Sequence, residues 1–167
     1  MGIQARNPHE EDELREDDDA GEPIDEAYDG GVEPAVLTAV DHVALVVDDL
    51  DEAVADHRDL FGVLVEHRDV WHEDDAEVAV LGVGPSSIWL IAPTSDDSEY
   101  AEFLAEGGPG LHHVGYRVAD VDEALEALRA AGREVIDESG RPGPGDTRVA
   151  LVHPDGTYGA LVMLVER

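Results

Sequence analysis

Two matching patterns of hydrophobic and polar positions run along this chain, one starting near residue 41 and the other near residue 112. In the first, the apolar, β-branched run 42–47 predicts a strand, and the apolar stripe after Asp49 predicts a helix that Gly62 ends. Further elements are expected as strands at about 63–69, 76–83 and 87–92, and as a short helix at 98–106.

The second pattern repeats the first. Residues 113–118 predict a strand, and a helix is expected between Asp120 and Gly132. Strands should follow at about 133–137, 147–152 and 159–165. Adding 71 to a residue number superimposes the two patterns with seven identities in thirteen positions, and it pairs His42 with His113. Each pattern therefore reads as one βαβββ module.

Neither module can cover the apolar face of its own sheet, so the two must pack together. We expect an α+β fold of two tandem βαβββ modules, with module one at about 41–93 and module two at about 112–166. The domain should span 35–167, and a ligand would bind in a cleft between the two curved sheets.

The first 34 residues have a different composition. They hold 13 acidic residues, three prolines and a Gly-Gly pair, against two arginines. Such a segment buries too little apolar surface to offset its ordering entropy, so 1–34 is interpreted as a disordered acidic tail.

The formal net charge is −31, with 41 acidic residues, ten arginines and no lysine. Nucleic acids are bound by cationic surfaces, so no DNA or RNA partner is expected. Molar salt would screen the repulsion among these negative charges, so the composition favours the interpretation as a halophilic protein. The absence of cysteine, of a long apolar run and of an N-terminal apolar segment predicts a cytoplasmic protein with no membrane partner.

Four segments carry a resemblance to a known family: DHVALVVDDLDEA, GPGLHHVGYRVADV, RPGPG and VHPDGTYGALV. They resemble the vicinal-oxygen-chelate superfamily, which includes glyoxalase I, and within it the methylmalonyl-CoA epimerases. The resemblance covers about 41–166. It implies paired βαβββ modules, a homodimer, and proton transfer next to a thioester carbonyl with the help of a divalent metal such as Co, Mn, Mg or Zn.

The resemblance also implies metal-ligand positions. Two of these positions hold His42 and His113, which are also the candidate catalytic bases. The two positions at which the family has Glu or Gln hold Trp89 and Met163, and a further family Glu aligns with Val78. Indole and thioether groups are poor partners for such ions, so we expect no tightly bound metal. A two-histidine site completed by water or substrate stays open as an alternative.

The remaining site candidates are interpreted in two ways each. Trp89 and Met163 either form an apolar floor for a ligand or simply fill the fold. Arg117 and Arg141 could bind a substrate anion, although Arg117 could equally pair with an acidic residue. His112 is expected at the surface or in ordinary packing.

Three functions are compatible with these residues. The chain could be a divergent epimerase-like isomerase acting on a small acyl or carbonyl compound. It could instead be a metal-free protein that binds or sequesters a small molecule on the same fold, or a scaffold without a ligand. By repeat symmetry, His42, Trp89, His113 and Met163 should converge on one cleft between the modules.

Overall fold

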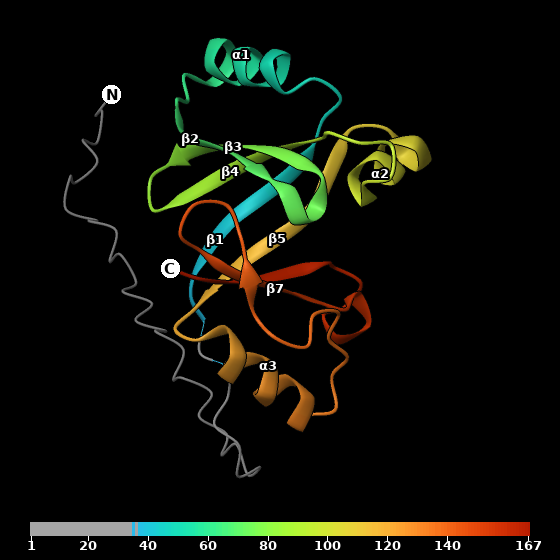
Figure 1. Ribbon diagram of the computed structural model, residues 1–167. Helices are drawn as coiled ribbons and strands as arrows, with labels where there is room; N and C mark the ends of the chain where they lie inside the picture. The colour runs from blue at the N-terminus through green and yellow to red at the C-terminus, as the bar shows by residue number, and fades with distance from the viewer. Residues whose placement is uncertain (1–34, 36) are drawn as a thin grey trace, which may run out of the picture. The chain divides into compact units, whose positions relative to one another are not determined.

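The computed structural model describes residue 35 and residues 37–167. The predicted disordered tail falls outside these residues, and the domain boundary at residue 35 stays a prediction. In the described part of the chain, eight strands form one mixed sheet that is accompanied by three α-helices (Figure 1). None of these helices has the length and apolar character needed to cross a membrane.

Both modules have the predicted order of strand, helix and three strands. Module one consists of β1 (Leu37–Val46), α1 (Leu50–Phe61), β2 (Val65–Trp71), the short helix η1 (His72–Asp74), β3 (Ala76–Val83) and β4 (Ser86–Pro93). Module two consists of β5 (Gly110–Val118), α3 (Val121–Ala130), β6 (Arg141–Pro142), β7 (Arg148–Val152), the short helix η2 (Pro154–Gly156) and β8 (Val162–Glu166). The helix α2 (Glu99–Gly107) lies between the modules in sequence.

Equivalent side chains cap the first helix of each module. The carboxylate of Asp49 accepts a hydrogen bond from the Glu52 amide at 3.0 Å, and Asp120 accepts one from the Glu123 amide at 2.9 Å. At the other end of α1, Gly62 has a φ of 68°, a left-handed conformation that glycine adopts without strain. The repeat found in the sequence is therefore a repeat of local structure.

The sheet has the strand order β2-β3-β4-β1-β5-β8-β7-β6, so it reads the same from its centre outward in both modules. At the centre, β1 and β5 are antiparallel and Val43 lies opposite Val114. Each of these strands pairs in parallel with the last strand of its own module, β4 or β8. The sheet curls into a half-barrel, which confirms the α+β fold of two tandem βαβββ modules (Figure 1).

The strand predicted at 133–137 is wrong. This segment makes an isolated bridge between Val135 and Val152, and the short strand β6 comes later in the chain. The side-chain carboxylate of Asp137, instead of a backbone carbonyl, accepts the hydrogen bond of the Leu151 amide at 2.8 Å. A side chain that takes over a ladder position in this way interrupts regular pairing.

Three clusters of buried side chains stabilise the domain. One lies between α1 and module one, and a second between α3 and module two. The third draws on strands of both modules and on α2, and it is the cluster that surrounds the candidate site. Its buried members are Ala44, Val46, Trp71, Ala76, Val78, Trp89, Ile91, Tyr100, Val149, Leu151, Met163 and Val165.

Candidate functional site

The side chains singled out by repeat symmetry do come together. The Nε2 atoms of His42 on β1 and His113 on β5 lie 2.9 Å apart, at hydrogen-bonding distance. The indole of Trp89 on β4 stacks on the His42 ring, with centroids 3.5 Å apart and planes 4° apart. Met163 on β8 pairs with Gly115 next to these rings and belongs to the same buried cluster as Trp89. Both modules thus contribute to one group.

All four side chains lie in the interior of the domain. His42 and Met163 are fully buried, and Trp89 and His113 are exposed by only 1% and 2%. In a solvent-excluded interior of this kind, polar groups must bond to one another because no water replaces a missing partner.

The two edge strands of the sheet, β2 and β6, contact each other. The Trp71 indole N–H at the end of β2 donates to the Pro142 carbonyl of β6 at 3.2 Å. Beside it, Arg141 binds Asp74 at 2.9 Å and lies over the Trp71 ring, 5.1 Å from its centroid. The outer strands of the two modules are therefore joined by a hydrogen bond and an ion pair.

A glycine on β5 makes room for the His42 ring. A Cβ atom at Gly115 would lie within 3.0 Å of three atoms of that ring, a separation that real Cβ atoms essentially never show. On its other side the ring already contacts Trp89. His42 is thus confined between a glycine and an indole.

Asp41 is a central residue that the sequence analysis missed. On β1, Val40 pairs with Tyr116 and His42 with Gly115, so Asp41 is the extra residue of a β-bulge. Its carboxylate is fully buried and lies 2.7 Å from the Nδ1 atom of His42. Strand alternation would put neighbouring residues on opposite faces, and the bulge explains why these two side chains nevertheless meet.

Two guanidinium groups bind the same carboxylate. Arg117 donates to Asp41 through Nε at 3.0 Å, and Arg167 donates through Nε at 2.7 Å and Nη2 at 3.1 Å. Burial alone would raise the pKa of Asp41. Hydrogen bonds from His42, Arg167 and Arg117 outweigh that effect and hold this pKa well below its ordinary value. Asp41 is consequently an ionised, buried hydrogen-bond acceptor.

A third histidine extends the group outward. Nδ1 of His112 lies 2.8 Å from Nδ1 of His113, and the His112 ring packs against Tyr100 and Phe103 of α2. Burial lowers the pKa of His112 to about 4 and lowers the pKa of His113 well below its ordinary value. Burial also lowers the pKa of His42, although the hydrogen bond to Asp41 opposes this. Burial thus favours the neutral form of all three rings.

The two arginines named as substrate-binding candidates are both engaged with carboxylates. Arg117 pairs with Asp41, while Arg141 pairs with Asp74 and with Asp137 at 3.1 Å. The alternative of an ion pair for Arg117 is thus what the structure shows. Substrate binding by either residue would require it to exchange such a partner, and it stays a prediction.

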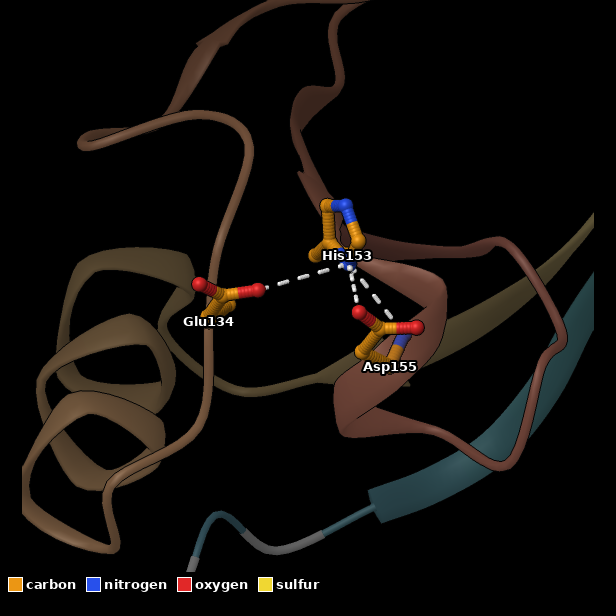
Figure 2. Close-up of side chains that lie close together, drawn as sticks. All are labelled: Glu134, His153 and Asp155. Carbon is orange, nitrogen blue, oxygen red and sulfur yellow. Dashed lines mark hydrogen bonds and ion pairs between the residues drawn. The ribbon is translucent and has the colours of Figure 1, made fainter.

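A second group of potential ligand atoms lies at the surface of module two. Figure 2 shows Glu134, His153 and Asp155, whose ligand atoms all lie within 4.8 Å of one another. The Nδ1 atom of His153 is 3.7 Å from a carboxylate oxygen of each acidic residue and accepts a hydrogen bond from the Asp155 amide. This group shares no residue with the buried histidines, so a metal bound here would be chemically separate from the inter-module site.

Comparison with known proteins identifies the family of this fold. Residues 41–151 match the model of the Glyoxalase/Bleomycin resistance protein/Dioxygenase superfamily. The ethylmalonyl-CoA/methylmalonyl-CoA epimerase of Cereibacter sphaeroides is 32% identical over 132 residues, which are 77% of this chain and 98% of that protein. The human mitochondrial methylmalonyl-CoA epimerase is 28% identical over 129 residues, which are 77% of this chain and 73% of that protein.

Solved structures show the same similarity in three dimensions. The methylmalonyl-CoA epimerase of Mycobacterium tuberculosis superposes with a TM-score of 0.76 at 32% identity, covering 81% of this chain and 91% of that one. The paired βαβββ modules, the matching family model and these relatives all indicate the same superfamily. The chain is a member of the Glyoxalase/Bleomycin resistance protein/Dioxygenase superfamily, and its similar curated and solved proteins include methylmalonyl-CoA epimerases.

Proposed function

We propose that this chain is a metal-independent member of its superfamily that binds a small acyl or carbonyl compound between its two modules and does not epimerise it. The observation that carries the proposal is the direct contact between the Nε2 atoms of His42 and His113, with Trp89 stacked on His42. Cytoplasmic location and a homodimer remain predictions that accompany it.

The donor set supports the absence of a metal. Two nitrogens bound at right angles to one ion, each about 2.1 Å away, would also lie about 3 Å apart, so the histidine contact alone is compatible with an ion. The adjoining side chains argue against an ion, because Trp89 and Met163 offer an indole and a thioether where divalent ions of this kind need oxygen or imidazole ligands. The residues present do not fit the divalent metal that the family resemblance implies.

The histidine contact also argues against epimerisation. Inverting a carbon centre by proton transfer requires one base on each side of that carbon, each within about 3–3.5 Å of the reacting atoms. His42 and His113 touch each other at 2.9 Å, so no carbon fits between them. We therefore assign the pair to hydrogen bonding and not to a two-base reaction.

The charges around the rim favour a ligand without phosphates. Arg141 is already paired with two carboxylates, and Arg148 lies 2.8 Å from Asp122 and 3.6 Å from Glu166. The net charge of −31 repels polyanions such as coenzyme A at long range. A short acyl compound without phosphates meets less repulsion.

Both tryptophans of the chain, Trp71 and Trp89, lie in the cluster around the site, so intrinsic fluorescence reports on it without background. We expect the propionyl thioester of N-acetylcysteamine to change the emission saturably at molar KCl. Trp71→Phe should keep this response and Trp89→Phe should lose it. A flat titration would contradict ligand binding, and deuterium incorporation at the α-carbon of methylmalonyl-CoA in D₂O would contradict the absence of epimerisation.

A further inference from the structure

The three histidines and Asp41 form one continuous row of hydrogen bonds. Asp41 contacts His42 at 2.7 Å, His42 contacts His113 at 2.9 Å, and His113 contacts His112 at 2.8 Å. Each contact joins two nitrogens or a nitrogen and an oxygen, so each needs one proton between its two atoms. The direction of every bond in the row therefore depends on the bond before it.

The first bond has a fixed direction. The Asp41 carboxylate is fully buried and binds the guanidinium groups of Arg117 and Arg167, so it is ionised and can only accept. His42 must then carry its hydrogen on Nδ1. Since a charged imidazole is costly in an interior that excludes water, the ring is neutral and its Nε2 atom is an acceptor.

The same reasoning applies to the next two hydrogen bonds. Because Nε2 of His42 accepts, His113 must donate through Nε2, which leaves its Nδ1 atom as an acceptor. His112 must then donate through Nδ1, which leaves an Nε2 lone pair at the outer end. His42 and His112 are both held as the Nδ1–H tautomer, which is the minor form of a free histidine side chain in water.

We infer that Asp41 is the positioning residue of this site: it fixes the tautomers of His42, His113 and His112 and turns the Nε2 lone pair of His112 outward as a hydrogen-bond acceptor. A buried carboxylate thus takes the orienting role that the family resemblance assigns to a divalent metal ion. The tautomer assignment is independent of the proposed function. Only the expected chemistry of the ligand rests on it. An acyl compound that reaches His112 beside Tyr100 and Phe103 should offer an O–H or amide N–H group and not a carboxylate.

The test is long-range ¹H–¹⁵N NMR of the full chain labelled with ¹⁵N-histidine in molar KCl, with His112→Gln and His42→Gln spectra for assignment. We expect Nδ1–H on His42 and His112, and Nε2–H on His113. Finding His42 as the Nε2–H tautomer in the unaltered protein would overturn the inference, and this result needs no variant that might fold poorly.

The Asp41→Asn variant provides a second test of the positioning role. The oxygen of the asparagine amide should take the Oδ1 position, to which Arg117 and Arg167 both donate through Nε. Its NH₂ group should then donate to His42, and the contact of Arg167 Nη2 with Oδ2 should be lost. All three histidines should change to the opposite tautomer, as expected when an orienting carboxylate becomes an amide. Asp49→Asn removes the same charge at a helix N-terminus where Asn caps equally well, so it should leave the tautomers unchanged. Unchanged tautomers in Asp41→Asn would refute the positioning role.

Two small compounds test the expected donor group of the ligand. Butyramide carries an amide donor and butyrate does not, and the two are otherwise alike in size. Butyramide should shift the Nε2 resonance of His112, whereas butyrate at equal ionic strength should not. A shift by butyrate, or by neither compound, would overturn the donor assignment. Because the tautomers are read without a ligand, failure of the ligand titration and failure of the Asp41 role can be told apart.

Discussion

Replacing Gly115 with alanine tests how tightly the His42 ring is confined. The added methyl group would lie within 3.0 Å of three ring atoms, and Trp89 blocks the opposite side at a centroid separation of 3.5 Å. Overpacking of a buried site costs about 1–3 kcal/mol. If the ring gives way, the buried bond to Asp41 is lost, at a cost of about 1–3 kcal/mol more. We therefore expect Gly115→Ala to lower the free energy of unfolding by about 2–6 kcal/mol.

Urea unfolding in molar KCl, followed by tryptophan fluorescence, measures this change. Gly110→Ala is a matched control on the same strand, because a Cβ atom there meets nothing within 4 Å. Its free energy of unfolding should stay within about 0.5 kcal/mol of the parent value. In a His42→Ala background the clash is absent, so Gly115→Ala should there cost less than about 0.5 kcal/mol. A Gly115→Ala protein as stable as the parent would refute the confinement of His42.

Three further predictions follow from charge, protonation and ligand chemistry. The melting temperature should rise from low to molar KCl because salt screens the net charge of −31, and a flat or falling curve would count against a halophilic protein. Burial lowers the pKa of His112 from 6.5 to about 4, so the unfolded chain binds more protons between these values and stability should fall as pH drops from 6.5 to 4. The contribution of His112 to this fall in stability should be missing in His112→Gln. A variant whose free energy of unfolding changes with pH as it does in the parent would contradict this prediction. The variant with Trp89→Glu and Met163→Glu should bind Co²⁺ between the modules where the parent does not, and failure to gain Co²⁺ would show that these positions do not converge as ligands.

The repeat was predictable because its signals are local. Alternation within the strands, the capping carboxylates Asp49 and Asp120 and the terminating Gly62 all act within a few residues of their own positions. The offset of 71 then predicted that His42 and His113 meet across the pseudo-twofold axis, and they do.

Asp41 was missed for a physical reason. Strict alternation places it on the sheet face opposite to His42, and no sequence signal marks the bulge that brings both side chains into the interior. Its partner Arg167 lies 126 positions away, so the pairing depends on the finished fold.

The enclosed interior was not predictable either. Trp71 and Pro142, whose hydrogen bond joins the two edge strands of the sheet, are 71 positions apart. The strand expected at 133–137 failed because the Asp137 side chain takes the place of a backbone acceptor. In both cases side-chain contacts between residues that are distant in the sequence override a local pattern.

The most direct test of metal independence is a Co²⁺ titration of the full chain purified in high salt without added metal, with bound cobalt counted by elemental analysis. A His153→Ala variant removes the contribution of the surface group formed with Glu134 and Asp155. In that variant we expect no stoichiometric cobalt and no change in Trp89 fluorescence. One equivalent of cobalt that persists in His153→Ala and disappears in His42→Ala would contradict it.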